Sequence, residues 1–400
     1  MLSLRSALND QGISACPNGL LGLNPFYKSS PDARKCFGFT RLSQIIKALR
    51  WPKSFVALGD HPADDNQGWQ NGPQGLAHDA VTWFFTREDA FLTIPITTDL
   101  QGLSSNHFDK RRSPIPLGNG ATYSLASTEP GGADTDIIQI DHMAGFNHLG
   151  ALTIQSLGDQ GLGDESIIYI PVQAGDGGNP NNKPIIYALQ SIAGQSITDH
   201  NWSAKISQPG DQGAWCAYDP VAKRLYTSDF YGAPGAPKDA TIAEWGLFAG
   251  TSVDVYSVGT PFVRDEGNPA GQQMVLTFRG SMQLFEADGT PALLLRIQGG
   301  FITDNRHLYL VQDDGTGIVG FDLITARKQR TIPVDYKHIQ GIWDKTYQEI
   351  EAACLFSNPP APGMSGDIHV LLWENGAIGI GEDFWIKHYG VSDPNDRPFI

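Results

Sequence analysis

Apolar and polar positions along the chain predict short β-strands that recur in groups of three. The runs VTWFFT at 81–86 and SIIYIPVQ at 166–173 combine β-branched and aromatic residues in lengths that suit strands. Each group opens at a Gly- or Asn-containing step and closes at turn residues. One short helix is expected at 42–49, where isoleucine and leucine recur at helical spacing before a Trp-Pro step. Almost everything after this helix is predicted to be strand.

Five such groups follow one another along the chain. Their strands are expected at 75–79, 81–86 and 91–96; at 146–155, 166–173 and 184–190; at 214–220, 224–230 and 252–258; at 299–304, 306–313 and 317–324; and at 349–356, 367–375 and 384–389. Three β-rich segments remain, at 54–58, 274–278 and 282–287. We expect these to supply a sixth group.

A triplet of this kind forms a small antiparallel sheet that cannot bury both of its faces alone, whereas a ring of such sheets packed face to face can. We therefore predict an all-β fold, a β-propeller of six blades. Five or seven blades, a large β-sandwich and a pair of barrels are the alternatives. Residues 1–60 are expected to be an irregular segment, stapled by a disulfide, that contributes to ring closure, and residues 61–400 a single propeller domain.

Composition supports many short strands and narrows the partners. The chain has 400 residues with 45 Gly, 26 Pro and only 18% charged residues. Its formal net charge of -15 would repel a phosphate backbone, so nucleic acid is not an expected partner. No apolar run approaches the roughly 20 residues that cross a bilayer, so no membrane partner is expected either. The oligomeric state is left open.

The four cysteines predict disulfides, because none has the C-x-x-C spacing of zinc or redox sites. Cys16 and Cys36 bracket a Pro- and Gly-rich segment that could hardly order itself by burial, so we pair them. Cys216 then pairs with Cys354 by elimination. Asn201 opens an N-x-S glycosylation sequon. Together these features favour a secreted, disulfide-bonded glycoprotein.

Candidate site residues come from the first strand of each triplet, because the innermost strand of a blade lines the propeller axis. We expect His78, His148 and Glu351 to act as general acid and base groups. The side chains expected to bind a substrate are Gln74, Asn147, Trp215, Tyr218 and Trp343. The alternative interpretation is that the two histidines are hydrogen-bonded at strand ends and hold adjacent blades together.

Metal and nucleophile chemistry have weaker signals. Asn147, Asp304 and Glu351 would supply oxygen ligands to calcium if they converged on one centre. The loop DDGTG at 313–317 lacks the carboxylate ladder of a calcium loop and is interpreted as a tight turn. The chain has no G-x-S-x-G, no H-E-x-x-H, no G-x-x-x-x-G-K-[ST] and no G-x-G-x-x-G that opens a helix. We expect no cofactor and no resident metal, with calcium as the alternative.

The segments QGLAHD, FNHLG, LYTSDF, QGGFITD with HLYLVQD, and EIEA resemble blade openings of secreted β-propeller proteins, which also often end with a segment similar to DFWIKHY. This resemblance spans 75–389. It implies the fold rather than an activity, because such propellers serve as hydrolases, lyases and binding modules.

An aromatic-rich chain without common enzyme motifs also resembles the fungal hetero-Diels–Alderases of tropolonic sesquiterpenoid pathways. This resemblance implies cycloaddition of a tropolone quinone methide to a macrocyclic sesquiterpene alkene, which needs orientation, apolar enclosure and a few hydrogen-bond donors. The expected function is a cofactor-independent cyclase or pericyclase of secondary metabolism that acts on an apolar small molecule in the central pocket. The alternatives are a metal-dependent hydrolase or lactonase that uses the central channel, and a carbohydrate- or protein-binding propeller.

Overall fold

The computed structural model describes the parts of the chain that form the sheets and their tight turns. These are residues 13–15, 21–23, 55–61, 69–70, 73–79, 82–87, 90–96, 115–118, 121–125, 136–140, 146–157, 165–174, 184–191, 201–205, 213–230, 250–259, 275–294, 296–303, 306–312, 317–334, 347–355, 368–375 and 382–391. The helix expected at 42–49 lies outside them. Within them, no helix is long and apolar enough to cross a membrane.

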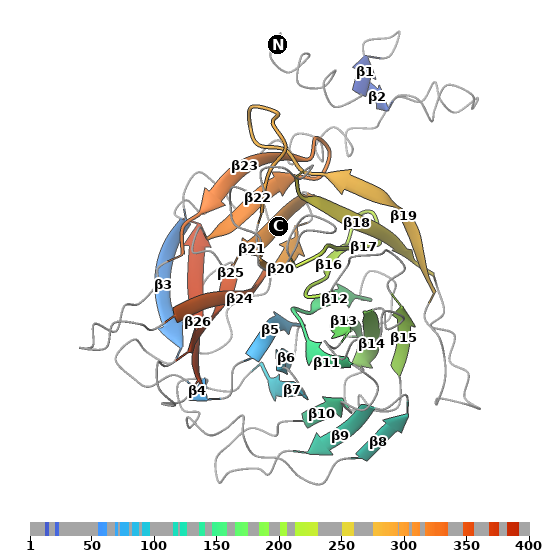
Figure 1. Cartoon of the computed structure of the whole chain (residues 1–400), viewed down its shortest axis with the longest axis vertical. Coiled ribbons are helices and arrows are strands. Elements are labelled where there is room, and N and C mark those ends of the chain that lie inside the picture. Colours follow the sequence, from blue (N-terminus) through green and yellow to red (C-terminus); the bar gives the residue numbers. More distant parts are fainter. Residues whose placement is uncertain are drawn as a thin grey trace.

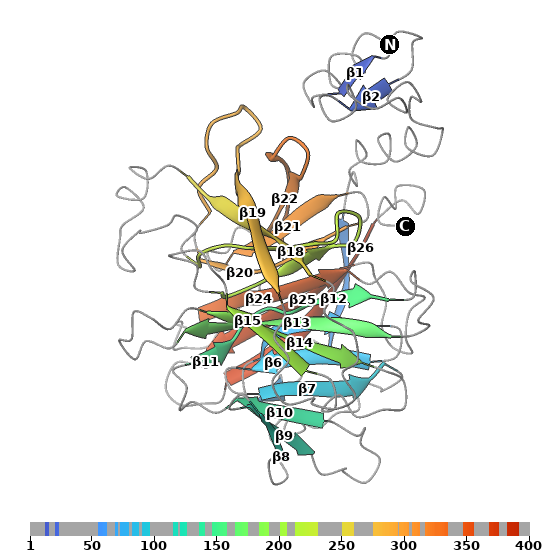
Figure 2. The same ribbon diagram turned by 90° about the vertical axis from the view of Figure 1, so that its right-hand side faces the viewer.

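Five antiparallel sheets in the described part of the chain stand around one axis, so the molecule is a five-bladed β-propeller (Figure 1). From the axis outward, blade 1 contains β5 (Pro73–His78), β6 (Thr82–Arg87), β7 (Ala90–Pro95), β10 (Asp136–Ile140), β9 (Ala121–Leu125) and β8 (Ile115–Gly118). Blade 2 contains β11 (Phe146–Leu149) and β12 (Thr153–Ser156), which both pair with β13 (Ser166–Ala174), then β14 (Ile185–Ser191) and β15 (Asn201–Lys205). Figure 2 shows β10, β9 and β8 extending blade 1 beyond β7.

The other three blades follow the same plan. Blade 3 contains β16 (Ala217–Asp219), β17 (Arg224–Thr227), β18 (Ser252–Val258) and β19 (Leu276–Gln283). Blade 4 contains β20 (Ile297–Ile302), β21 (His307–Gln312), β22 (Ile318–Asp322) and β23 (Arg327–Ile332). Blade 5 contains β24 (Tyr347–Leu355), β25 (Ile368–Asn375), β26 (Glu382–Val391) and β3 (Phe55–His61), with β4 (Trp69–Gln70) also on β26. The hairpin of β1 (Ile13–Ala15) and β2 (Leu21–Leu23) lies apart from the ring in Figure 1.

The propeller prediction is confirmed, and so are the five strand triplets, but the count of six blades is wrong. The segments reserved for a sixth blade are outer strands of other blades. Residues 276–283 form β19, which pairs with β18, and residues 55–61 form β3, which pairs with β26. A strand early in the chain thus completes the last blade and joins the two ends of the ring.

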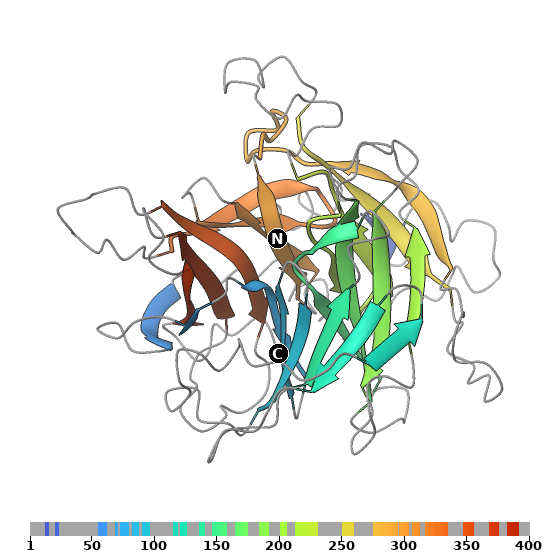
Figure 3. The ribbon, with the colours of Figure 1, turned by 60° about the horizontal axis from the view of Figure 1, so that its bottom comes forward.

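The inner strands contact one another in cyclic order: β5 with β12, β12 with β16, β16 with β20, β20 with β24, and β24 with β5. In Figure 3 the blue strands of blade 1 accordingly lie between the red strands of blade 5 and the green strands of blade 2. The largest apolar cluster joins all five blades. It includes Leu76, Ala151, Trp215, Leu310 and Leu371. Both faces of a blade are therefore covered, which is why β14, β21 and β22 are buried along their whole length and read as continuous apolar runs.

The disulfide expected between Cys216 and Cys354 is not formed. Both residues are buried free thiols in blades 3 and 5, and they belong to different apolar clusters. Burial raises the pKa of both thiols far above the ordinary value, because the thiolate would lose its hydration. Pairing by elimination failed because buried cysteine also serves as a small apolar side chain. Cys16 and Cys36 lie outside the described residues.

Candidate functional site

A layer of glycine and alanine residues closes the axis where the inner strands meet. A Cβ atom on Gly75 would lie 3.0 Å from Ala151 Cα, and one on Gly299 would lie 3.1 Å from Ala352 Cα and 3.2 Å from Ala151 Cβ. Blade 4 thus reaches both blade 5 and blade 2 at this level. A Cβ on Gly150 would lie 1.8 Å from the carbonyl oxygen of Ala214. We call these six residues the glycine–alanine layer.

Blades 2 and 3 are joined through this layer by hydrogen bonds. The inner strand of blade 2 leaves β13 between β11 and β12, where Pro171 accepts a bond from Gly150 N but has no N–H of its own to donate. Ala151 instead donates its N–H to Ala214 O at 2.9 Å and accepts from Cys216 N at 3.1 Å. This contact is a parallel bridge, so the two inner strands run in the same direction.

Four of the five inner strands carry a β-bulge before the layer, on the side from which the strand enters it. The register shifts fall between Pro73 and Gly75, Phe146 and His148, Ile297 and Gly299, and Ile350 and Ala352. The extra residue at each shift has no register partner on the next strand. These residues are Gln74, Asn147, Gln298 and Glu351. Bulges re-aim side chains and are frequent beside active sites.

We define the bulge ring as these four extra residues together with Glu349. Gln298 donates a hydrogen bond from Nε2 to Glu349 Oε2 at 3.2 Å, which joins blade 4 to blade 5. Gln74, Gln298 and Glu349 are partly buried, and Glu351 is 1% exposed. Trp373 is the register partner of Glu349 on β25, and its partly buried indole packs on the central apolar cluster. The bulge end thus combines amides, carboxylates and an aromatic wall.

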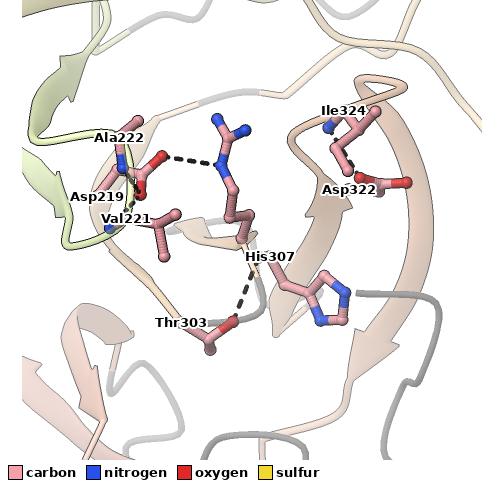
Figure 4. A network of polar contacts seen from close by, with 8 residues as sticks. Asp219, Val221, Ala222, Thr303, His307, Asp322 and Ile324 are labelled. Atoms are coloured by element: carbon pink, nitrogen blue, oxygen red, sulfur yellow. Dashed lines mark hydrogen bonds and ion pairs between the residues drawn. The ribbon is translucent and has the colours of Figure 1, made fainter. Parts of the chain in front are cut away.

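At the opposite end, where each inner strand turns into the second strand, the polar side chains are used by the turns. Asp219 Oδ1 accepts the N–H groups of Val221 and Ala222 at 2.9 and 2.8 Å, and Oδ2 accepts Arg306 Nε at 3.2 Å (Figure 4). Thr303 Oγ1 accepts His307 N at 3.2 Å in the equivalent turn of blade 4. We call this end the turn end, and its polar groups serve as turn caps and as an ion pair between blades 3 and 4.

His78 lies at the turn end and not in the bulge ring. It is the last residue of β5, three positions after Gly75, and its Nε2 is 3.0 Å from the carbonyl oxygen of Leu355 in blade 5. Its Nδ1 is 3.0 Å from Asp79 O. Burial lowers the pKa of His78, and the two nearby carbonyl groups offset this effect in part. His148 precedes Ala151 by three positions, so its backbone lies on the bulge-end side of the layer.

The predicted aromatic contacts lie within blade interfaces. Trp215 is fully buried and donates from Nε1 to Ser228 Oγ at 3.0 Å. Tyr218 is 6% exposed and stacks on Tyr169 with ring centroids 5.8 Å apart, between blades 2 and 3. Trp343 and Asp304 lie outside the described residues. Of the residues expected from the sequence, the structure therefore brings Gln74, Asn147, Glu351 and the backbone of His148 to one end of the axis.

Sequence reasoning missed Gln298 and Glu349. The signal was present, because PQG at 73–75 and IQG at 297–299 place a glutamine before the same layer glycine. No group of three His, Cys, Asp or Glu residues close enough to hold a metal ion occurs in the described ranges. Any cation at the bulge ring would therefore take its two carboxylates together with amide or backbone oxygens, which are ligands that calcium accepts.

Comparison with known proteins gives the following results. No protein-family model and no curated protein matches the chain. Among solved structures, a luciferin-regenerating enzyme is 12% identical, with a TM-score of 0.38 over 83% of this chain and 95% of that one. A gluconolactonase from Xanthomonas campestris is 12% identical, with a TM-score of 0.37 over 84% and 89%. The calcium-binding protein regucalcin from Agrobacterium tumefaciens is 9% identical, with a TM-score of 0.38 over 83% and 93%.

Proposed function

We propose that the protein binds a small organic molecule at the bulge end and orients it for a cofactor-independent cyclisation. The observation that supports this proposal is the set of four bulges, which add two glutamines, an asparagine and a glutamate to inner strands that otherwise pack through glycine and alanine. A bulge costs one ladder position, so its repetition at one end of the axis favours a functional role.

The roles follow from the chemistry of each group. Glu349 is partly exposed and held by Gln298, so it would accept a proton or hydrogen bond from a ligand hydroxyl. The amide N–H groups of Gln74 would donate to a ligand carbonyl on which charge develops during ring formation. Trp373 would supply an apolar wall that holds a flat reactant in a reactive pose. Glu351 lies buried behind the ring.

The test is a reaction whose uncatalysed product is a mixture of stereoisomers. A tropolone quinone methide is generated in situ with a macrocyclic sesquiterpene alkene, and the product is resolved by chiral chromatography. We expect the protein to raise the rate and give one stereoisomer in excess. Glu349→Gln should lower the rate enhancement about 100-fold, the lower range for loss of a general acid or base.

Gln298→Ala should lower the rate enhancement about tenfold, because it frees the Glu349 carboxylate to adopt other positions. Gln329→Ala is the matched control. Gln329 is likewise the extra residue of a bulge, but on the outer strand β23. Two results would contradict the proposal. One is a stereoisomer ratio that the wild-type protein does not change, and the other is an equal loss of rate enhancement in Gln298→Ala and Gln329→Ala.

A metal-dependent lactonase is the second candidate, favoured by the oxygen donors of the same ring. Two carboxylates and three amides suit calcium better than a transition metal. Calorimetry determines whether the protein binds one calcium ion per chain. Hydrolysis of glucono-1,5-lactone is then measured with calcium bound, after chelation and after calcium is added back. The cyclase proposal would be replaced by the lactonase if hydrolysis is lost when calcium is removed and recovers when calcium is added back. Glu351→Gln should then abolish hydrolysis. If neither activity is detected but the protein binds a sugar or a peptide, the function would be that of a carbohydrate- or protein-binding propeller.

A further inference from the structure

Blades 1 and 5 meet where the ring closes, through contacts of β5 with β24 and β25. We call this contact the closure seam. Cys354, His369 and His388 are register partners across β24, β25 and β26, so their side chains share one face of blade 5. That face lies against blade 1, because the His369 ring is 5.4 Å from the ring of Trp83 and 6.5 Å from that of His78.

The three histidines form a continuous row across the seam. The rings of His369 and His388 meet edge to face with centroids 4.7 Å apart, and the two residues are 0% and 2% exposed. His78 extends the row to blade 1 and touches the backbone of β24 at Leu355 O. The closing contact of the propeller therefore passes through three groups that titrate near neutral pH.

We propose that the closure seam is an acid-sensitive latch, closed while His78, His369 and His388 are neutral and opened when they take up protons. Two imidazolium rings 4.7 Å apart in an apolar interface would repel each other and lose their hydration. Opening separates β5 from β24 and gives each charged ring access to water. The other blade interfaces have no such row among their described residues.

The charges that face the row do not offset it. On β5 and its turn, Asp79 accepts Thr82 N at 2.8 Å through Oδ1. On β24, Cys354 is a thiol whose pKa burial raises, and Glu351 lies beside the layer three residues earlier. On β26, Lys387 is 4% exposed and adjoins His388 in sequence, but alternation along the strand places the two side chains on opposite faces of blade 5.

The remaining strand against β26 is β3, where Asp60 is the register partner of Lys387 and His61 that of Ile386. β6 contributes the neutral indole of Trp83. Protons taken up by the closed row would therefore repel chiefly one another.

The direction with pH follows from His78, whose pKa burial lowers below the ordinary 6.5. The closed seam is stable above about pH 6.5, and it weakens as pH falls, because the open state takes up protons that the closed state does not. Each proton taken up on opening multiplies the opening constant by about ten for every pH unit. Three histidines set an upper limit of about 1,000-fold per unit.

Hydrogen exchange of the full chain tests the latch, with intrinsic rates corrected for pH. Between pH 7 and pH 5 the amides of β5, β24 and β25 should show an opening constant that rises at least tenfold per unit. Those of β17, β18, β21 and β22 should not change. The slope is the change in the logarithm of the opening constant per pH unit, which counts the protons taken up on opening. His369→Phe keeps a ring against Trp83 and should reduce this slope by about one proton. His388→Phe should reduce it by the same amount. His307→Gln, at a buried histidine of blade 4, should leave it intact.

Three results would overturn the latch. The first is an opening constant of the wild-type seam that does not change with pH. The second is an equal rise of the opening constant in all five blades. The third is an unchanged slope in the variant that carries both His369→Phe and His388→Phe. If that variant does not fold, the wild-type profile together with His388→Gln decides the question. Exchange that responds to zinc or to a chelator at pH 7 would assign the row to metal binding and would also overturn the proposal.

Discussion

The two ends of the inner strands use the same kinds of side chain in opposite ways. At the turn end, Asp219, Asp79 and Thr303 accept the N–H groups of their own turns, so their oxygens are consumed within the fold. At the bulge end, Gln74 and Gln298 come from positions where the ladder is interrupted, and Gln298 donates to Glu349 across the boundary between blades 4 and 5. The residue type alone therefore does not mark a site. Its place relative to the ladder separates a turn cap from a side chain that a bulge re-aims.

The glycine–alanine layer keeps the two ends apart. Because a Cβ atom on Gly299 would meet both Ala352 and Ala151, blades 2, 4 and 5 approach one another closely at this level. A ligand at the bulge end would contact one side of the layer. The turn caps stabilise the hairpins on the other side of the layer. The contrast predicts large losses of stability at the layer, intermediate losses at the turn end and small losses at the bulge end.

The largest effect is expected for Gly150→Ala. Its Cβ would lie 1.8 Å from Ala214 O, an atom that cannot retreat without breaking the bond from Ala151 N. We expect the free energy of unfolding in urea to fall by about 4 kcal/mol or more. Gly259→Ala is the control, because its nearest atom would be 3.3 Å away. A Gly150→Ala variant as stable as the control would mean that the layer does not hold the axis.

An intermediate effect is expected for Asp219→Ala. The variant loses two turn bonds and the partner of Arg306, and we expect about 2 to 3 kcal/mol of destabilisation. Asp322→Ala removes the equivalent cap from the next hairpin turn of blade 4, where Ile324 N and Thr325 Oγ1 donate but no arginine does. Its loss should be about 1 kcal/mol, as for other caps. Equal losses in urea titrations would show that the ion pair adds nothing.

Sequence patterns recovered the strands but not their assembly. Every inner triplet was predictable because strands buried on both faces read as short apolar runs between turn residues, as in β14 and β21. The blade count was not, because β3 and β19 pair with strands that only the closed ring brings beside them. Register across such distances depends on the whole ring and not on local composition.

The site was predictable in the same partial way. Gln74, Asn147 and Glu351 were predicted because polar residues are conspicuous in inner strands, and the structure places all three at bulges, whereas Glu349 was not considered. For His78, the sequence could not tell at which end of the inner strand the side chain lies, and the structure places it at the turn end. For Trp215, nothing in its surroundings along the chain reveals that its N–H is donated to Ser228, so its ligand role stays a prediction.

A smaller effect is expected for Tyr169→Phe, which removes a bond between strands of blade 2 at the turn-end half. Tyr169 donates from its hydroxyl to Gln155 Oε1 at 2.6 Å, so the variant should lose about 1 kcal/mol at pH 7. Burial raises the pKa of Tyr169 well above 10, so in the wild type the stabilisation is present below pH 10 and lost as pH rises beyond it. The variant should lose less stability between pH 10 and 11.5 in urea titrations. An identical alkaline profile would contradict this assignment.

The smallest effect is expected for Gln298→Ala at the bulge end. Its side chain is partly buried, and its one described bond, 3.2 Å to Glu349 Oε2, joins two groups that water can reach when the partner is absent. Removing it should change the free energy of unfolding by no more than about 0.5 kcal/mol. Glu349→Gln and the double variant complete a cycle whose coupling energy should also be small. A side chain that contributes so little to the fold, placed by a bulge at the axis, fits a role toward a ligand. A loss above about 1.5 kcal/mol, the upper end for an ordinary hydrogen bond, would instead make Gln298 a structural link between blades 4 and 5, and the contrast between the two ends would disappear.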